Sequence, residues 1–279
     1  MKIAVTGAGG YIGAHIVDEA LSRGHEVLAI DVSLKNISDK AIKKNIDIFA
    51  THENIFEALG EPDVLIHLAW RDGFIHNSEQ HMKNLSSHIE FIRDFVKAGG
   101  KNIAVMGSMH EVGYHEGAVD EDTPTNPESQ YGIAKNAMRE SLMLASKELA
   151  FNLYWLRAYY IFGDDAYGSS IFSKLTRAAN NGETSFPFTT GKNLYDFIHV
   201  KDLAKMIVAA STQDKVTGVI NVATGKARSL ADQVEWFIKE HNWPIKLAYG
   251  AFPDRPYDSP GIWADATKIN EIMADYDKL

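Results

Sequence analysis

The stretch that decides the fold lies near the N-terminus and reads Thr6-Gly7-Ala8-Gly9-Gly10-Tyr11-Ile12-Gly13. It follows a short apolar run, Ile3–Thr6, and opens a segment of helical period over 11–23. In such a unit the first glycine allows a sharp turn and the second lets the backbone approach a pyrophosphate, while the third lets helix and strand pack closely. The spacing is GxxGxxG rather than GxGxxG, and its context predicts a dinucleotide site that includes Gly7, Gly10, Tyr11, Ile12 and Gly13.

Asp31 ends the next apolar run, Glu26–Ile30, and stands 18 residues after Gly13. An acidic side chain at this place accepts hydrogen bonds from both hydroxyls of the adenosine ribose, and it repels a 2′-phosphate. The sequence therefore predicts NAD rather than NADP as the cofactor. Asp47 and Ile48, in a third apolar run, are expected either to flank the adenine or to form an ordinary turn.

Short apolar runs alternate with longer segments of helical period, as they do in βαβ units with a parallel sheet. We expect an α/β fold in which a Rossmann-type, doubly wound parallel sheet covers 1–162, and 195–213 returns to it. A smaller, discontinuous C-terminal substrate lobe is expected from 163–194 and 214–279. The expected strands are 3–6, 26–30, 46–49, 64–68, 103–106, 153–156, 195–200 and 219–222. The expected helices are 11–23, 53–59, 81–98, 129–149, 168–181, one from 201, and 229–240, whereas the proline-rich stretch 243–261 is expected to be an extended arm.

Composition excludes several classes of protein. The chain has 279 residues, no cysteine and a net charge of −9. An acidic balance argues against a nucleic-acid partner, and the lack of cysteine excludes disulfides, thiol nucleophiles and cysteine-ligated metals; no metal site is expected. No run approaches the roughly 18–20 apolar residues of a membrane span, and the N-terminal run is too short for a signal peptide. We expect a cytoplasmic protein that does not bind membranes.

A second motif, Tyr131-Gly132-Ile133-Ala134-Lys135, lies near the start of the helical segment 129–149. Residues four apart on a helix share one face. A lysine ammonium beside a tyrosine favours phenolate and so lowers the pKa of the phenol. The tyrosine then acts as a general acid or base on a sugar hydroxyl or ketone. Behind a dinucleotide fingerprint, the motif predicts Tyr131 and Lys135 as a catalytic pair, with Lys135 also holding the nicotinamide ribose.

The chain resembles the extended short-chain dehydrogenase/reductase superfamily, in particular the NAD-dependent epimerase/dehydratase family acting on nucleotide sugars. The segments that carry the resemblance are Thr6–Gly13, Asp63–Ala69, Asn84, Ser108, Tyr131–Lys135, Asp196–Asp202, Asn221–Gly225 and Arg255–Asp258. The resemblance implies that Tyr131 is the acid/base and that Asn84 is the family's active-site asparagine. It also implies that Leu68-Ala69 lines the cofactor groove and that Arg255 meets the substrate's diphosphate.

Several positions depart from the family's pattern. The place of the usual serine or threonine falls on Met109, which cannot donate a hydrogen bond. Ser108 is therefore the expected catalytic serine, and His110 is expected either to share its task or to lie in an ordinary loop; histidine donates protons near neutral pH. Glu111 is expected at the surface.

Other departures concern the substrate. Tyr160 stands where the resemblance leads us to expect an asparagine that meets the diphosphate, and Tyr195 replaces the usual arginine before Asp-Phe. The run Trp70-Arg71-Asp72-Gly73 is also unusual for the family, and Arg71 is expected to be exposed.

Three functions fit these features to different degrees. The first is NAD-dependent transfer of hydride at a sugar carbon, C4 being favoured, of a nucleoside-diphosphate sugar, by an epimerase, a dehydrogenase or reductase, or a 4,6-dehydratase. The second is oxidation of a free sugar acid, as in the uronate dehydrogenases. The third, a protein that binds NAD without turnover, is disfavoured because Tyr131 and Lys135 are both present. The segment 136–149 is apolar on two faces, which is consistent with a homodimer or with burial inside one chain.

Overall fold

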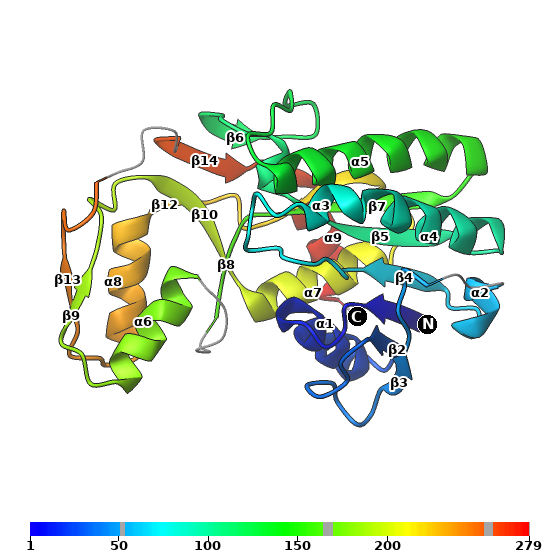
Figure 1. Ribbon diagram of the computed structural model, residues 1–279, viewed down its shortest axis with the longest axis horizontal. Helices are drawn as coiled ribbons and strands as arrows, with labels where there is room; N and C mark the ends of the chain where they lie inside the picture. Colours follow the sequence, from blue (N-terminus) through cyan, green and yellow to red (C-terminus); the bar gives the residue numbers. More distant parts are fainter. Residues whose placement is uncertain (51–53, 164–169, 254–258, 279) are drawn as a thin grey trace.

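The fold is built on a seven-stranded parallel sheet (Figure 1), in a computed structural model that describes residues 1–50, 54–163, 170–253 and 259–278. Its strands pair in the order β11 (Gly218–Val222), β7 (Asn152–Ala158), β5 (Asn102–Ser108), β4 (Val64–His67), β1 (Lys2–Thr6), β2 (Glu26–Asp31) and β3 (Ile42–Asn45). The chain reverses its direction of travel across the sheet between β1 and β4. Ligands of doubly wound sheets bind outside the carboxyl ends of the strands at such a point.

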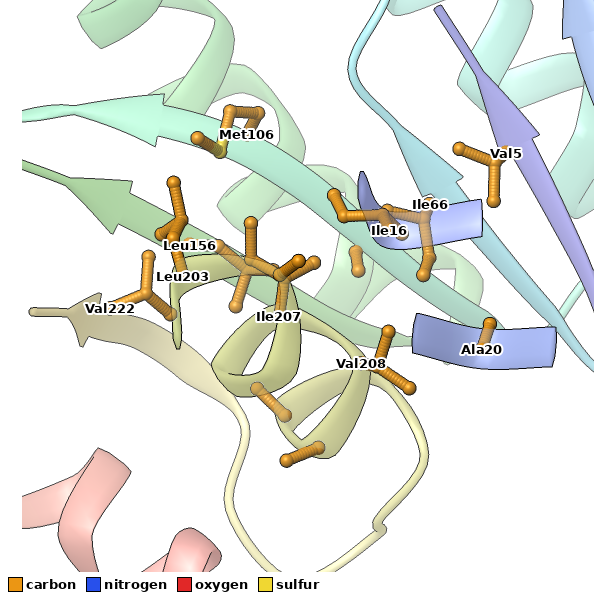
Figure 2. Packing of buried hydrophobic residues seen from close by; sticks show 14 of the residues in the cluster. Val5, Ile16, Ala20, Ile66, Met106, Leu156, Leu203, Ile207, Val208 and Val222 are labelled. Carbon is orange, nitrogen blue, oxygen red and sulfur yellow. The ribbon is translucent and has the colours of Figure 1, made fainter. Parts of the chain in front are cut away.

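Helices cover both faces of this sheet, as the doubly wound prediction requires. One face carries α1 (Tyr11–Ser22), α7 (Val200–Ser211) and α9 (Thr267–Tyr276), and the other carries α2 (Ile55–Ala58), α4 (Leu85–Lys97) and α5 (Gln130–Leu149). Figure 2 shows side chains of α1 and α7, among them Ile16 and Ile207, packed against apolar residues of the strands. The strands read as continuous apolar runs because both of their faces are buried.

The prediction of a third strand at Ile46–Phe49 was wrong. The strand is β3, which begins four residues earlier and has the sequence Ile-Lys-Lys-Asn. This strand is the outermost of the sheet and is only partly buried, so it does not need an apolar run. The apolar residues that follow β3 lie outside the sheet. Ile48 is buried in the core between the sheet and the helices α2, α4 and α5, and Phe49 packs against this core.

A second, five-stranded sheet runs from β12 and β10, left of centre in Figure 1, to β14 and β6 at its top. It comprises β12 (Ala227–Ser229), β10 (Leu194–His199), β14 (Gly261–Ala264) and β6 (Gly117–Val119), with β8 (Tyr160–Phe162) paired to β10. An aromatic core lies between this sheet and the helices α6 (Ile171–Asn180) and α8 (Leu230–Glu240). A separate pair of short strands, β9 (Ser185–Pro187) and β13 (Lys246–Ala248), lies in the same part of the chain.

Five elements lie elsewhere than the expected lobe boundaries put them. Of these, β6 and β8 fall within 1–162 but pair in the smaller sheet. The strand β11 and the helix α9, both expected in the lobe, belong to the large sheet and its covering layer. Of the segment 195–213, α7 does return to the large sheet, but β10 pairs only with strands of the smaller sheet. The strands β10 and β11 have similar lengths and are both buried along most of their residues, so the sequence does not show which sheet each of them joins. Among the described residues, no helix is both long enough and apolar enough to cross a bilayer.

Candidate active site

The glycine-rich turn between β1 and α1 lies at the point where the strand order reverses. Gly7 has a φ of +72°, and a Cβ on it would lie 2.7 Å from the backbone nitrogen of Ala69. A Cβ on Gly13 would lie 2.1 Å from the carbonyl oxygen of Gly7. Gly10 precedes the first turn of α1 and offers no capping side chain, so the helix N-terminus is open to an anion.

Asp31 is aligned at the end of β2 by two backbone groups. Its Oδ2 accepts a hydrogen bond from the backbone N–H of Gly9 at 2.9 Å, and its Oδ1 accepts one from Ser33 at 3.0 Å. A Cβ on Gly9 would lie 2.2 Å from the carbonyl oxygen of Ser33, so the glycine allows this close approach. The carboxylate is thereby fixed at the mouth of the turn.

A groove opens from this turn along the edge of the sheet. Seven of the expected cofactor residues line it, namely Gly7, Gly10, Asp31, Asp47, Ile48, Leu68 and Ala69. The sequence did not single out the remaining lining residues for this role: Ile30, Val32, Ile46, Phe49, Trp70 and Arg71. Arg71 is exposed, as expected, and its guanidinium lies 5.2 Å from the centre of the Phe49 ring. A cation at the groove suits a phosphate-bearing ligand.

Four expected cofactor residues do not line the groove, namely Tyr11, Ile12, Gly13 and Lys135. Ile12 packs against the core beneath α1, and the ring of Tyr11 lies edge-on to His15. The hydroxyl of Tyr11 comes close to Gly163, where a Cβ would lie 2.1 Å from it. Tyr11 and Ile12 therefore pack α1 in position and do not line the groove.

Replacing Gly13 with alanine is expected to weaken NAD binding at least tenfold, because the methyl group would force the turn away from the phosphate path. Isothermal titration calorimetry with NAD measures the loss. Gly73→Ala is the matched control, since nothing lies within 4 Å of a Cβ at that glycine. Wild-type affinity in Gly13→Ala would show that this turn does not hold the dinucleotide.

The first turn of α5 carries Tyr131, and three contacts fix where this turn lies. Ser129 caps the helix by accepting a hydrogen bond from Gly132 N–H at 3.1 Å. The backbone N–H of Tyr131 donates to the carbonyl of His76 at 2.8 Å, which ties the helix start to the loop after β4. A Cβ on Gly132 would lie 2.3 Å from the carbonyl oxygen of His110, so glycine lets the helix approach the loop after β5. This approach brings Tyr131 to Ser108 and His110.

Tyr131 lies among polar and aromatic side chains. A hydrogen bond with Ser108 lowers the pKa of its phenol, but burial is the larger influence and raises that pKa to about 12. The imidazole rings of His76 and His110 have their centres 5.7 and 5.9 Å from the phenol ring. Burial lowers the pKa of His110 to about 4, so this histidine is neutral at physiological pH. Ser108 and His110 both therefore stand beside the expected acid/base.

Lys135 is buried one turn further along α5. Its Nζ donates a hydrogen bond to the carbonyl oxygen of Met106 at 2.8 Å and lies 5.9 Å from the centre of the Tyr131 ring. Burial lowers the pKa of Lys135 to about 7. The expected lowering of the phenol pKa by this lysine is therefore not seen in this state, because burial disfavours both charged forms.

Glu111 is not at the surface, as the sequence led us to expect, but completely buried. Its carboxylate accepts hydrogen bonds from Trp155 Nε1 at 2.9 and 3.0 Å, from Ser108 N–H at 2.6 Å and from Arg157 Nε at 3.5 Å. Arg139 lies 3.7 Å away. Through the bond to Ser108, the buried carboxylate fixes the loop that faces Tyr131. The sequence did not reveal this role, because the partners on β7 are more than 40 residues away.

The expected substrate residues lie at several places. Asn84 lies between α3 (Gln80–Lys83) and α4, and its buried Nδ2 has no hydrogen-bond partner among the described residues. The ring of Tyr160 lies 4.0 Å from that of Tyr195, so the two tyrosines that replace the family's usual residues lie against each other. Arg255 lies outside the described residues. Nor do the described residues hold any group of three or more side chains that could bind a metal.

Residues 3–223 match the NAD dependent epimerase/dehydratase family. The chain belongs to this family. NAD is the cofactor of this family, and the α/β fold with its parallel sheet is the family's fold.

Individual relatives agree with the family, and solved structures agree with the fold. The chain is 42% identical over 268 residues to the dTDP-6-deoxy-L-talose 4-dehydrogenase (NAD(+)) of Aggregatibacter actinomycetemcomitans, covering 94% of this chain and 99% of that protein. The structure of UDP-N-acetylglucosamine 4-epimerase from Methanobrevibacter ruminantium M1 superposes with a TM-score of 0.85 over 97% of this chain and 91% of that one, at 24% identity. MoeE5 in complex with UDP-glucose and NAD gives a TM-score of 0.79 over 98% and 92%, at 26% identity.

Proposed function

We propose that this family member is an NAD-dependent dehydrogenase or reductase that moves hydride at C4 of a nucleoside-diphosphate sugar, and that a dTDP-6-deoxyhexose is its substrate. The observation that carries the proposal is the meeting of Tyr131, Ser108 and Lys135 beside a groove built for a dinucleotide. The choice of dehydrogenase over epimerase is supported by the 42% identical relative, which is a dTDP-6-deoxy-L-talose 4-dehydrogenase.

In this proposal, Tyr131, Ser108 and Lys135 have different roles in proton transfer at C4. Tyr131 takes the proton of the C4 hydroxyl during oxidation and returns it during reduction. Ser108, hydrogen-bonded to the phenol, orients the substrate oxygen, and Lys135 favours the phenolate when it is charged. Bound NAD⁺ supplies the hydride acceptor. Asn84 is proposed to donate its free amide N–H within the site, and Tyr160 to contact the sugar nucleotide.

A panel of dTDP-, UDP- and GDP-sugars tests this proposal. Each sugar is incubated with the protein and NAD⁺ or NADH, and the absorbance at 340 nm is followed. We expect a stoichiometric change with a dTDP-6-deoxyhexose or its 4-keto form. Epimerisation of a sugar with no net change at 340 nm would assign the chain to the epimerases instead.

A second candidate is oxidation of a free sugar acid, and it is favoured by the paired tyrosines, Tyr160 and Tyr195, at positions where the resemblance implies diphosphate contacts. Calorimetry with dTDP, UDP and GDP separates the two. If no nucleotide binds while a uronic acid is oxidised, the second candidate holds.

Asp31→Asn is expected to reduce the preference for NAD over NADP, measured as the ratio of their kcat/KM values, at least tenfold. The reason is that the amide removes the charge that repels a 2′-phosphate while keeping a similar shape. Asp39→Asn, which neutralises an exposed carboxylate paired with Lys43, is the charge-matched control. An equal drop in both variants would refute a local role for Asp31.

We further propose that the protein is cytoplasmic and forms a homodimer through the exposed side of α5, where Leu144 is 61% exposed. Light scattering of the wild type and of Leu144→Glu measures the association. A wild-type mass equal to one chain would refute the homodimer.

A further inference from the structure

The side chain of Trp70 faces the ammonium of Lys135. Lys135 Nζ lies 3.8 Å from the centre of the indole ring, which is well within the range of a cation–π interaction. The same indole meets the Tyr131 ring edge-on, with the ring centres 6.0 Å apart. Trp70 therefore contacts both members of the expected catalytic pair. Its position in the sequence, outside the family's motifs, does not indicate this contact.

Two histidines fix the orientation of the Trp70 indole, His81 through a hydrogen bond at the ring edge and His88 by stacking on the ring face. Its Nε1–H donates to His81 Nδ1 at 3.0 Å, and the other ring nitrogen of His81 lies 2.9 Å from the carbonyl oxygen of Ile75, which fixes the tautomer. The indole also stacks on His88, with ring centres 4.6 Å apart and planes 14° apart. Both histidines are almost completely buried, so the orientation of the indole is set by the core.

From His88, polar contacts continue through His67 to Thr6, the residue at the start of the glycine-rich turn. His88 Nδ1 lies 2.9 Å from His67 Nε2, and His67 Nδ1 lies 2.8 Å from Thr6 Oγ1. Burial lowers the pKa of His67 to about 3 and that of His88 to about 2, so both rings are neutral at physiological pH. This chain of polar groups therefore adds no positive charge near Lys135.

Few groups favour a charge on Lys135. Burial opposes the ammonium. The carbonyl oxygen of Met106, which accepts a hydrogen bond from Nζ at 2.8 Å, favours it, and so does the carboxylate of Glu111. Tyr131 also faces Lys135, and because burial raises the pKa of its phenol to about 12, it is neutral. The indole face carries negative electrostatic potential, and a cation gains most from it in a desolvated site. Trp70 thus acts together with the Met106 carbonyl and the Glu111 carboxylate in stabilising the charged lysine.

We propose that Trp70 is a positioning residue, whose indole face keeps Lys135 charged and directed toward the reaction site. The proposal rests on the proposed role of Lys135 beside Tyr131. Trp70 itself acts through the lysine and is given no proton or hydride to transfer.

Nuclear magnetic resonance of protein labelled with ¹³Cε-lysine tests the contact without any substrate. Lys135→Arg assigns the signal. We expect wild-type Lys135 to show methylene protons shifted upfield by the indole ring current. Trp70→Phe should retain an upfield shift, because it keeps an aromatic face, whereas Trp70→Leu should abolish it and lower the proton affinity of Lys135 about tenfold. Trp236→Leu, which removes an indole stacked near Arg228, is the matched control and should leave the signal unchanged.

The kinetic test uses the pH dependence of kcat/KM. Its alkaline limb should move about one pH unit lower in Trp70→Leu and stay in place in Trp70→Phe, because loss of the indole makes the lysine easier to deprotonate. A wild-type Lys135 signal without ring-current shift would overturn the proposal even if Trp70→Leu did not fold. Equal titration of Lys135 in wild type and Trp70→Leu would also overturn it. Failure of the sugar panel alone would leave the resonance result intact and would count against the proposed function only.

Discussion

Tyr131→Phe is expected to reduce turnover at least a hundredfold while leaving NAD affinity close to that of the wild type. The variant keeps the ring that lies between His76, His110 and Trp70, so the site retains its shape. It removes only the phenol oxygen that is hydrogen-bonded to Ser108 and proposed to carry the proton. General acid–base catalysis contributes about 10² to 10⁴ in rate, which sets the expected loss. Steady-state kinetics at 340 nm and calorimetry with NAD measure the two effects.

Tyr276→Phe is the matched control. It removes a phenol whose hydroxyl donates to Glu19 at 3.2 Å, on the helix layer of the opposite face. Its turnover should equal that of the wild type. If Tyr131→Phe keeps more than a tenth of wild-type turnover, another group carries the proton and His110 becomes the leading candidate.

Glu111→Ala is expected to lower the free energy of unfolding by about 3–5 kcal/mol. The substitution leaves Arg157, whose side chain has no exposed surface, without its counter-charge, and it deprives Trp155 Nε1 and Ser108 N–H of their acceptor. Removing one member of a buried ion pair has a cost of this size because the remaining charge stays buried and uncompensated. Urea denaturation followed by circular dichroism gives the change in free energy.

The control for this prediction is Glu140→Ala, which removes the exposed partner of Arg139. An exposed ion pair contributes about 1 kcal/mol or less, so the control should unfold nearly as the wild type does. A loss in Glu111→Ala no larger than that in Glu140→Ala would contradict the buried-pair interpretation.

Local patterns in the sequence predicted the parts of the fold that depend on local constraints. The glycines of the turn, Asp31 at the end of β2 and the alternation of strands and helices each follow from a requirement that a few neighbouring residues satisfy. The edge strand β3 was misplaced because its exposed side tolerates lysine and asparagine, so it lacks the apolar pattern of the inner strands.

The remaining differences come from contacts between distant residues. Glu111 meets Arg157 and Trp155 only after β7 has taken its place beside β5. Trp70 contacts Lys135, His81 and His88 in the folded chain, although no local motif connects these residues. The pKa of Tyr131 illustrates the same limit, since the spacing to Lys135 predicts its partner but the burial that raises the pKa depends on the whole fold.

The two backbone hydrogen bonds to Asp31 have a consequence for how cofactor preference could change during evolution. Because Gly9 and Ser33 hold both carboxylate oxygens before a ligand arrives, the ribose site proposed at Asp31 is preorganised, and little side-chain entropy would be lost on cofactor binding. The same rigidity prevents the carboxylate from rotating away from a larger ligand. We therefore expect Asp31→Asn alone to weaken the preference for NAD, whereas a full reversal toward the phosphorylated dinucleotide also requires the turn at Gly9 and Ser33 to be rebuilt.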